Sequence, residues 1–173
     1  MPHRPDDVIL HGADADRPRV ALSDDVISFI ESGVSIVCAV VGPADRAQTG
    51  RALAARVLPD ATIRVIFANE GNEAIATAAK AGGKIAMTFS APMSHRTVQI
   101  KGYSSGLEEL DREDDAVTGQ QCDAFAGVLR AAGHPPGFVQ AFLNYRLSKL
   151  WVVSFPAHEA FEQTPGPGAG RSL

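Results

Sequence analysis

Two arginines set among small or polar residues are the side chains of this sequence best suited to bind an anion. Arg51 is flanked by Gly50 and Ala52, and Arg96 begins a run of alternating residues. A guanidinium presents a planar fork that meets a phosphate or carboxylate with two parallel hydrogen bonds. The same pattern also fits a solvated charge at a strand edge, so both interpretations stay open at this point.

Other patterns that would identify a reaction are missing from the sequence. It contains no P-loop, no kinase motif set and no Gly-x-Ser-x-Gly nucleophile elbow. None of its five histidines has a second ligand at helical spacing, so no metal site is predicted. The glycine-rich run at 166–170 has the composition of a dinucleotide loop, but no strand closely precedes it and no helix can follow it. We interpret it as backbone that passes close to a flat ligand or to another subunit.

Composition places the chain among globular proteins and excludes several function classes. Its 173 residues, 45% hydrophobic and 21% charged, fit one domain. The net charge of −4 lacks the basic excess of a nucleic-acid binder. No apolar run approaches the roughly 20 residues of a membrane helix. Cys38 and Cys122 lack the spacing of a zinc site or a disulfide framework, so we expect a cytoplasmic protein.

Hydrophobic patterning predicts a mainly β protein with added helices. The clearest feature is a hairpin, whose strands span 84–90 and 97–103 with apolar residues at alternate positions. Residues 46–58 fit either a helix or a strand, and we favour a strand over 50–57. The other predicted elements are a helix over 23–33, a strand over 34–41, a strand over 62–68, helices over 69–80, 116–132 and 138–145, and a last strand over 150–155. Short links between neighbouring strands favour an antiparallel sheet, closed as a six-stranded barrel with helices attached.

The remaining segments complete the predicted organisation. Residues 107–115 are acidic but lack calcium-loop spacing, so a solvated helix start is preferred to a metal site. We expect an extended arm over 1–20, a split-barrel domain over 21–164, and a Gly/Pro-rich tail over 165–173, with no regular structure over 164–170.

Three segments together resemble the pyridoxamine 5′-phosphate oxidase-like family of FMN-binding split-barrel proteins. Residues 24–36 are similar to the opening helix and first strand of that family. Residues 85–90 and 96–102 resemble its central hairpin, in which an arginine opens the second strand and a glycine closes it, and 160–170 look like the tail of a small subgroup. The resemblance implies a six-stranded split barrel, a homodimer, and FMN held in a groove at the dimer interface. Some relatives bind haem or a deazaflavin instead.

The resemblance also implies a set of cofactor-binding residues, with Arg51 as the arginine that contacts the flavin ring and phosphate. The full set is Arg51, Ala52, Phe67, Ala68, Asn69, Asn72, Ser94, Arg96, Thr97 and Gly166. After the third strand, family members carry a serine or threonine and an Arg-Lys pair, whereas this chain has Glu70 and Glu73. A carboxylate 4 Å from a phosphate costs about 4 kcal/mol at an effective dielectric constant near 20. Backbone N–H groups of Gly71 and Asn72, at the start of a helix, are the remaining anion donors expected there.

Three functions follow as hypotheses. The first is an FMN-dependent oxidoreductase with a small-molecule substrate, in which the flavin carries the redox chemistry and no catalytic side chain need exist. Oxidation of pyridoxamine phosphate itself is not expected, because the C-terminal Arg-Leu-x-Pro of the true oxidase is absent. The second is a non-catalytic cofactor-binding or carrier module. The third is a haem-binding relative with His95 or His158 as the axial ligand.

Overall fold

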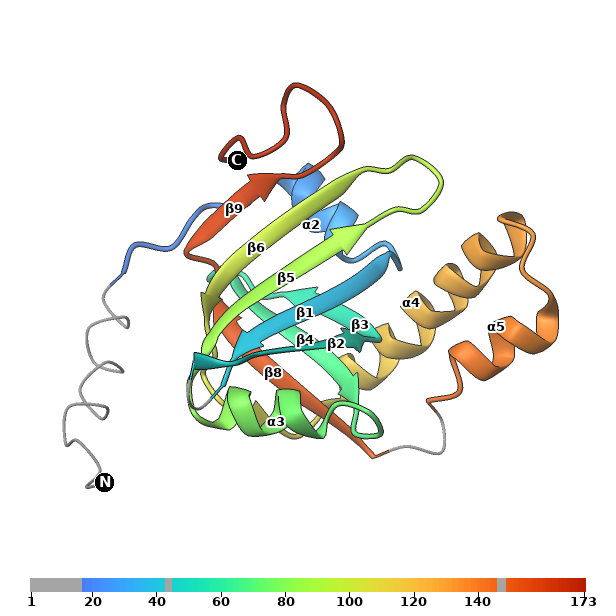
Figure 1. Ribbon diagram of the computed structural model, residues 1–173, viewed down its shortest axis with the longest axis horizontal. Coiled ribbons are helices and arrows are strands. Elements are labelled where there is room, and N and C mark those ends of the chain that lie inside the picture. Colours follow the sequence, from blue (N-terminus) through green and yellow to red (C-terminus); the bar gives the residue numbers. More distant parts are fainter. Residues whose placement is uncertain (1–16, 43–44, 146–148) are drawn as a thin grey trace.

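Two antiparallel sheets form the centre of the protein in the computed structural model, which describes residues 17–42, 45–145 and 149–173 (Figure 1). The five-stranded sheet has the order β2-β1-β5-β6-β9 and the four-stranded sheet the order β3-β4-β8-β7. The strands are β1 (Ser35–Val41), β2 (Ala47–Ala52), β3 (Ala54–Val57), β4 (Thr62–Ala68), β5 (Lys84–Ser90), β6 (Thr97–Tyr103), β7 (Leu107–Glu108), β8 (Leu150–Pro156) and β9 (Glu159–Glu162). The helices are α2 (Asp24–Ile30), α3 (Glu73–Lys80), α4 (Arg112–Ala131) and α5 (Pro136–Phe142).

The predicted fold class is confirmed as mainly β with helices, but the expected closure of six strands into one barrel is not found in the described residues. The described residues form nine strands in two sheets that do not close into one barrel. The strand expected over 50–57 is in fact two strands, because the chain leaves the five-stranded sheet after Ala52 and enters the four-stranded sheet at Ala54. The short strands β7 and β9 were not predicted, since two and four residues carry too little alternation to detect.

The predicted β5–β6 hairpin is confirmed at both of its strand boundaries. Its apolar side chains and those of β1 face the core, where they meet the inner side chains of β4 and β8. The fully buried residues of this core include Ile36, Phe89, Ile100, Phe67 and Phe155. Each such side chain contributes about 1.5–3 kcal/mol of burial free energy.

Helix α4 covers the other face of the four-stranded sheet, which is why β4 is buried on both faces. Ile66 packs there with Ala54 and Val152, and Val117 packs against them. The Gln121 side-chain amide donates to the carbonyl oxygen of Ala55 at 2.7 Å and accepts from its N–H at 3.0 Å. This glutamine therefore satisfies the free edge of β3 as another strand would.

Helix α4 begins at Arg112, four residues before its predicted start. Asp111 and Asp114 form a reciprocal capping box at its N-terminus. The acidic run is thus a helix start, as predicted, but it is not wholly solvated. Asp114 is fully buried, because two arginines of the sheet lie against it.

The C-terminal tail turns back onto the five-stranded sheet. Ser172 forms a β-bridge with Phe161, and the N–H of Leu173 donates to the carbonyl oxygen of Ala160 at 3.0 Å. These last residues cover the free edge of β9, while residues 164–170 form only bends and turns. The expected N-terminal arm falls mostly outside the described residues.

Candidate functional site

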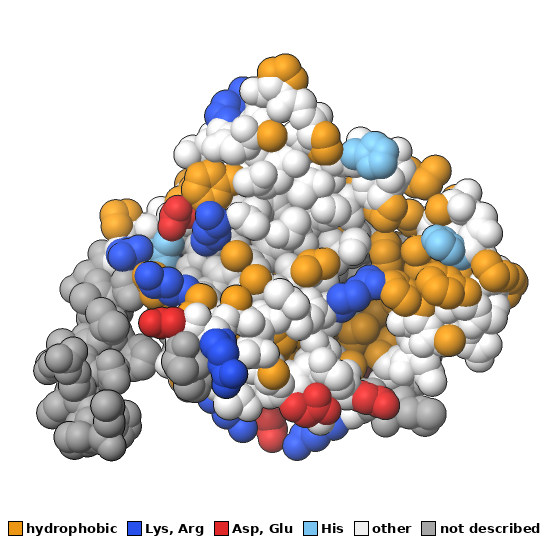
Figure 2. All heavy atoms as spheres, viewed as in Figure 1, with side chains coloured by type: hydrophobic (Ala, Val, Ile, Leu, Met, Phe, Trp, Pro, Cys, Tyr) orange, Lys and Arg blue, Asp and Glu red, His pale blue; other side chains and the backbone are white. Residues whose placement is uncertain are grey.

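The five-stranded sheet has one face turned away from the core, which we call the outer face (Figure 2). Cross-strand pairing places one row of side chains across all five strands, in the order Arg51, Val37, Thr88, Gln99 and Phe161. Most other side chains on this face are small or polar, and the Gln99 amide donates to the Thr88 hydroxyl at 3.1 Å. Val37 is 43% exposed. Within the described residues, no helix covers this face.

Arg51 stands at the β2 end of this row, against the rings of the α4–α5 hairpin. Its guanidinium carbon lies 3.9 Å from the ring centroid of Phe142 and 5.9 Å from that of Phe125. No carboxylate of the described residues forms an ion pair with it. The residue as a whole is exposed, but the rings that pack against its guanidinium displace part of the surrounding water, and this desolvation lowers the pKa of Arg51. An anionic ligand would supply the missing counter-charge.

An aromatic column continues from Arg51 along α5, and sequence reasoning missed it. Phe142 stacks on Phe138 with centroids 5.4 Å apart, and Phe138 stacks on His134 at 4.7 Å. Figure 2 shows these hydrophobic side chains gathered over α4 and α5 beside a basic side chain. Phe138 and Phe142 are four residues apart in α5, which places them on one helix face and could have revealed their pairing, whereas His134 precedes the helix.

The buried side chain of Asn72 is hydrogen-bonded to the backbone of Arg51. Its side-chain amide donates to the carbonyl oxygen of Ala68 at 2.9 Å and to that of Arg51 at 3.3 Å. The residue is buried, and a Cβ added at Gly50 would come within 2.2 Å of its Oδ1 atom. The side chain expected to contact a cofactor thus joins β2, β4 and the start of α3, and Gly50 is the residue that leaves room for it.

The backbone donors expected at the start of α3 are already used within the chain. The N–H of Gly71 donates to Glu73 Oε1 at 3.4 Å, and the N–H of Asn72 donates to the carbonyl oxygen of Asn69 at 3.0 Å. Glu70 and Glu73 are both exposed. The residues present here therefore offer a phosphate no free backbone donor at Gly71 or Asn72.

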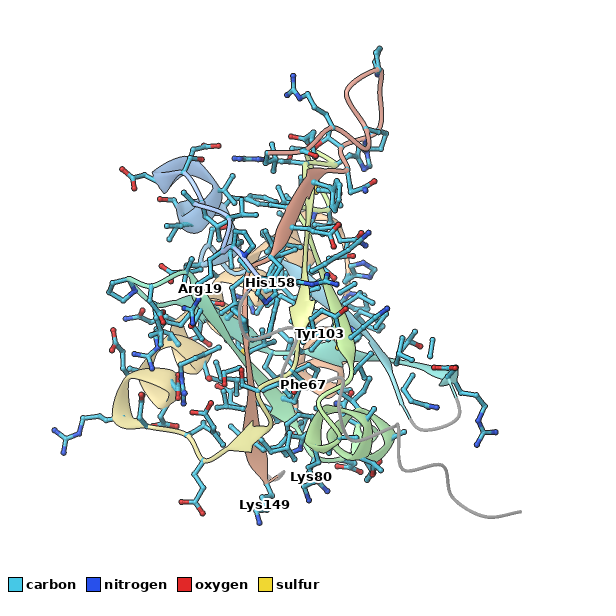
Figure 3. All side chains as sticks on the ribbon, turned by 90° about the vertical axis from the view of Figure 1, so that its left-hand side faces the viewer. Arg19, Phe67, Lys80, Tyr103, Lys149 and His158 are labelled. Carbon is cyan, nitrogen blue, oxygen red and sulfur yellow. The ribbon has the colours of Figure 1, made fainter. Side chains whose placement is uncertain are left out.

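The predicted residues of β4 lie toward the core instead of the outer face. Phe67 is fully buried and stacks on Trp151 with centroids 4.7 Å apart (Figure 3). Ala68 and Asn69 are half-buried at the end of the strand, and Ala52 is buried next to Arg51. A ligand on the outer face would not meet the Phe67 ring.

The predicted hairpin residues lie at the other side of the sheet from Arg51. The Arg96 guanidinium forms an ion pair with Asp25 and lies 4.3 Å from the Phe29 ring centroid, so α2 already neutralises it. Ser94 caps the Arg96 N–H in the exposed turn. The Thr97 N–H donates to the Thr164 hydroxyl at 3.0 Å, which ties the hairpin to the tail that carries Gly166. One subunit therefore does not bring Arg51 and Arg96 together.

The two histidines considered as haem ligands lie at opposite ends of β6. His95 is in the turn before it, with a φ of 60°. The His158 N–H donates to the carbonyl oxygen of Lys101, and its ring meets Tyr103 edge-on at 6.3 Å (Figure 3). The described residues contain no cluster of side chains that could hold a metal ion. They also contain no helix with the length and apolar character needed to span a membrane.

Comparisons with known proteins define the class of fold. No family model matches the sequence, and no curated protein is similar to it in sequence. HupZ of Group A Streptococcus is similar in structure at 13% identity and a TM-score of 0.54, over 87% of this chain and 100% of that chain. A pyridoxinephosphate oxidase-family protein of Clostridium acetobutylicum is similar at 11% identity and a TM-score of 0.46, over 79% and 84% of the two chains. The haem storage protein HutZ of Vibrio cholerae follows at 12% identity and a TM-score of 0.46, over 83% and 95%.

The likeness to HupZ, whose TM-score is above 0.5, shows the fold: this chain shares its architecture with that protein. The fold is consistent with the split barrel of pyridoxamine 5′-phosphate oxidase-like proteins, the class that the hairpin and opening helix of the sequence resemble.

Proposed function

We propose that the protein is a cytoplasmic FMN-binding oxidoreductase, which holds the flavin against the outer face of the five-stranded sheet and acts on a small-molecule substrate. The observation that carries this proposal is Arg51, a guanidinium on that face with no carboxylate partner in the described chain. The resemblance of the sequence to FMN-binding split-barrel proteins assigns the flavin contact to the same residue. When bound, the flavin supplies the redox chemistry, while the protein binds and orients it.

The proposal includes a second copy of the chain. Arg51 and Phe161 lie in one row but four strand spacings apart, which is roughly 19 Å at 4.8 Å per strand. Thr97 and the tail with Gly166 lie on the Phe161 side of the sheet. One ligand can contact both groups if Arg51 comes from one subunit and the hairpin and tail come from its partner. A homodimer with the groove at its interface provides this arrangement.

The test is flavin retention by Arg51→Ala. The purified protein is mixed with FMN, desalted, and its visible spectrum and mass in solution are recorded. We expect a yellow dimer, and we expect at least tenfold weaker FMN binding in Arg51→Ala, the size of about 1.4 kcal/mol of lost charge-assisted hydrogen bonding. The matched control is Arg46→Ala, which removes an exposed arginine just before the same strand. Equal FMN retention in both variants would remove Arg51 from the site.

A second candidate, a non-catalytic carrier or binding module, is favoured by the start of α3. Glu73 takes the Gly71 N–H that an anion would use, and Glu70 adds a second exposed carboxylate nearby. A protein that stays colourless after FMN addition and desalting supports this candidate. A Soret band after haem addition, lost in His95→Ala or His158→Ala, would instead assign the fold to haem.

A further inference from the structure

A hollow of about 190 Å³ opens on the outer face, at the end of β5 and β6 away from their connecting turn. Its floor is formed by Ala39, Ala47 and Ala86, and Tyr103 forms one wall. None of these residues belongs to the set that sequence reasoning assigned to a cofactor.

The strand register explains why this place is hollow. Ala39 pairs with Ala86 across β1 and β5, and Ala86 pairs with Lys101 across β5 and β6. One row along, Lys84 pairs with Tyr103. Alanines therefore stand beside the longest side chains of the face, and the difference in length creates the depth. An apolar floor with long cationic side chains at its rim follows directly from this pairing.

Two ammonium groups stand at the rim, and neither forms an ion pair with a carboxylate of the described residues. Lys84 and Lys101 are diagonal neighbours on adjacent strands, about 7–8 Å apart at their stems. The Nζ atom of Lys84 lies 6.0 Å from the Tyr103 ring centroid, and that of Lys101 lies 4.6 Å from the Phe161 ring centroid. Glu159 pairs with Lys101 in register, yet it forms no ion pair with either lysine.

An anion placed between the two ammonium groups would pair with both, and no carboxylate of the described residues does so. Like charges on adjacent strands repel each other, and acidic residues elsewhere in the chain pair readily with arginines. Pockets that are mainly apolar with a few convergent charged groups are typical of small-ligand sites.

We propose that this hollow binds a small flat organic anion, an aromatic ring that carries one carboxylate. The ring lies on the alanine floor beside Tyr103, and the carboxylate meets the ammonium groups of Lys84 and Lys101. The hollow shares the outer face with Arg51 but does not depend on the flavin. Its occupation can therefore be measured on flavin-free protein, separately from the proposed function.

The probe is benzoate, with benzyl alcohol as its neutral counterpart. Both are titrated into flavin-free protein, and binding is followed by calorimetry and by NMR shifts of the Ala39 and Ala86 methyl groups. We expect benzoate to bind and benzyl alcohol to bind at least tenfold more weakly. The double variant Lys84→Gln/Lys101→Gln should weaken benzoate binding at least tenfold, because it removes both charges and keeps the side-chain length.

Two further variants separate the charge from the shape. Ala86→Leu places three more carbons on the floor and should abolish benzoate binding while both lysines remain. Lys80→Gln, on the exposed last turn of α3, is the matched control and should bind benzoate as the unaltered protein does. Equal binding of the two probes, or unchanged benzoate binding in Ala86→Leu, would overturn the proposal.

The mass of the protein in solution identifies the main rival occupant, a carboxylate from a second copy of the chain. If benzoate does not bind, and the lysine double variant converts a dimer to a monomer, the two lysines hold the partner subunit and the small-molecule site is refuted. Loss of FMN binding in Arg51→Ala leaves benzoate binding unchanged, so either proposal can fail while the other stands.

Discussion

Three arginines of neighbouring strands have opposite surroundings in the two sheets. Arg56 and Arg64, on the four-stranded sheet, are each 8% exposed and lie against the acidic start of α4. Arg51, on the five-stranded sheet, lies against aromatic rings and meets no carboxylate of the described chain. Carboxylates of α4 and its N-cap thus neutralise Arg56 and Arg64. Arg51, on the outer face, has no counter-ion among the described residues.

The pKa values of these arginines shift in opposite directions for this reason. Hydrogen bonds to Asp114 raise the pKa of Arg64. Burial by itself would lower the pKa of Arg56, but the Asp111 hydrogen bond and the acidic charges around it raise it. Burial without such a partner lowers the pKa of Arg51. A guanidinium already saturated by carboxylates has a structural role, whereas one with an unmet charge is available to a ligand.

The largest expected effect comes from removing the carboxylate that the two structural arginines share. Asp114 is fully buried, forms ion pairs with Arg56 at 3.0 Å and Arg64 at 2.7 Å, and accepts from the Asp111 N–H. Asp114→Ala should lower the free energy of unfolding by about 3–5 kcal/mol, because it leaves two arginines short of a counter-ion in a buried setting. Urea denaturation of the variant and the unaltered protein measures the difference.

Asp115→Ala is the matched control, since its exposed carboxylate lies on the same first turn of α4. It should change the free energy of unfolding by no more than about 0.5 kcal/mol. If Asp114→Ala were as mild as this control, the contrast between the two groups of arginines would fail on the structural side.

Acid should weaken the same network, and the sign follows from its carboxylates. A hydrogen bond from Ser154, together with Arg64, holds the pKa of Glu108 below its ordinary value of 4.5. A carboxylate whose pKa is lower in the folded state stabilises the protein above the unfolded-state value and loses that contribution as the pH falls through the folded-state value. We expect the free energy of unfolding to fall as the pH drops below about 4.5.

Glu108→Gln should make this fall shallower, because the glutamine does not titrate. The measurement is urea denaturation repeated at several pH values, and Glu109→Gln, the exposed neighbouring position, is the control. The same slope in Glu108→Gln and in the control would show that Glu108 does not contribute to the acid response.

The sequence predicts an element of this fold well where a single local pattern, such as alternation of apolar residues, specifies it. The β5–β6 hairpin was predicted with both its strand boundaries because its alternation is clean over two seven-residue strands. The break at Leu53 was not, since the short, alanine-rich strand β3 is buried at three consecutive positions and so has no alternation that would mark where it begins. The buried state of Asp114 was also missed, because it depends on Arg56 and Arg64, about fifty residues away along the chain.

In the candidate site, too, local patterns could be interpreted from the sequence, whereas contacts between distant residues could not. The type of Arg51 and its small neighbours fitted both an anion clamp and a solvated edge charge, and only the family resemblance implied a cofactor contact; its lack of a carboxylate partner among the described residues is compatible with both. Phe142 was missed because its contact with Arg51 joins α5 to β2 across ninety residues. No local pattern reports such a contact, although the i, i+4 aromatic spacing marks the helix face that makes it.

The smallest expected effect tests whether the Phe142 ring holds Arg51 in the way that carboxylates hold Arg56 and Arg64. Phe142→Leu removes the ring 3.9 Å from the guanidinium and should cost about 0.5–1 kcal/mol of unfolding free energy through the lost cation–π contact. Combined with Arg51→Met in a double-mutant cycle, the coupling energy should have the same size, and urea denaturation measures it. Phe138→Leu is the control, because Phe138 stacks on Phe142 and His134 and its substitution leaves the Arg51–Phe142 contact in place. A coupling energy near zero would mean that the Phe142 ring does not position Arg51.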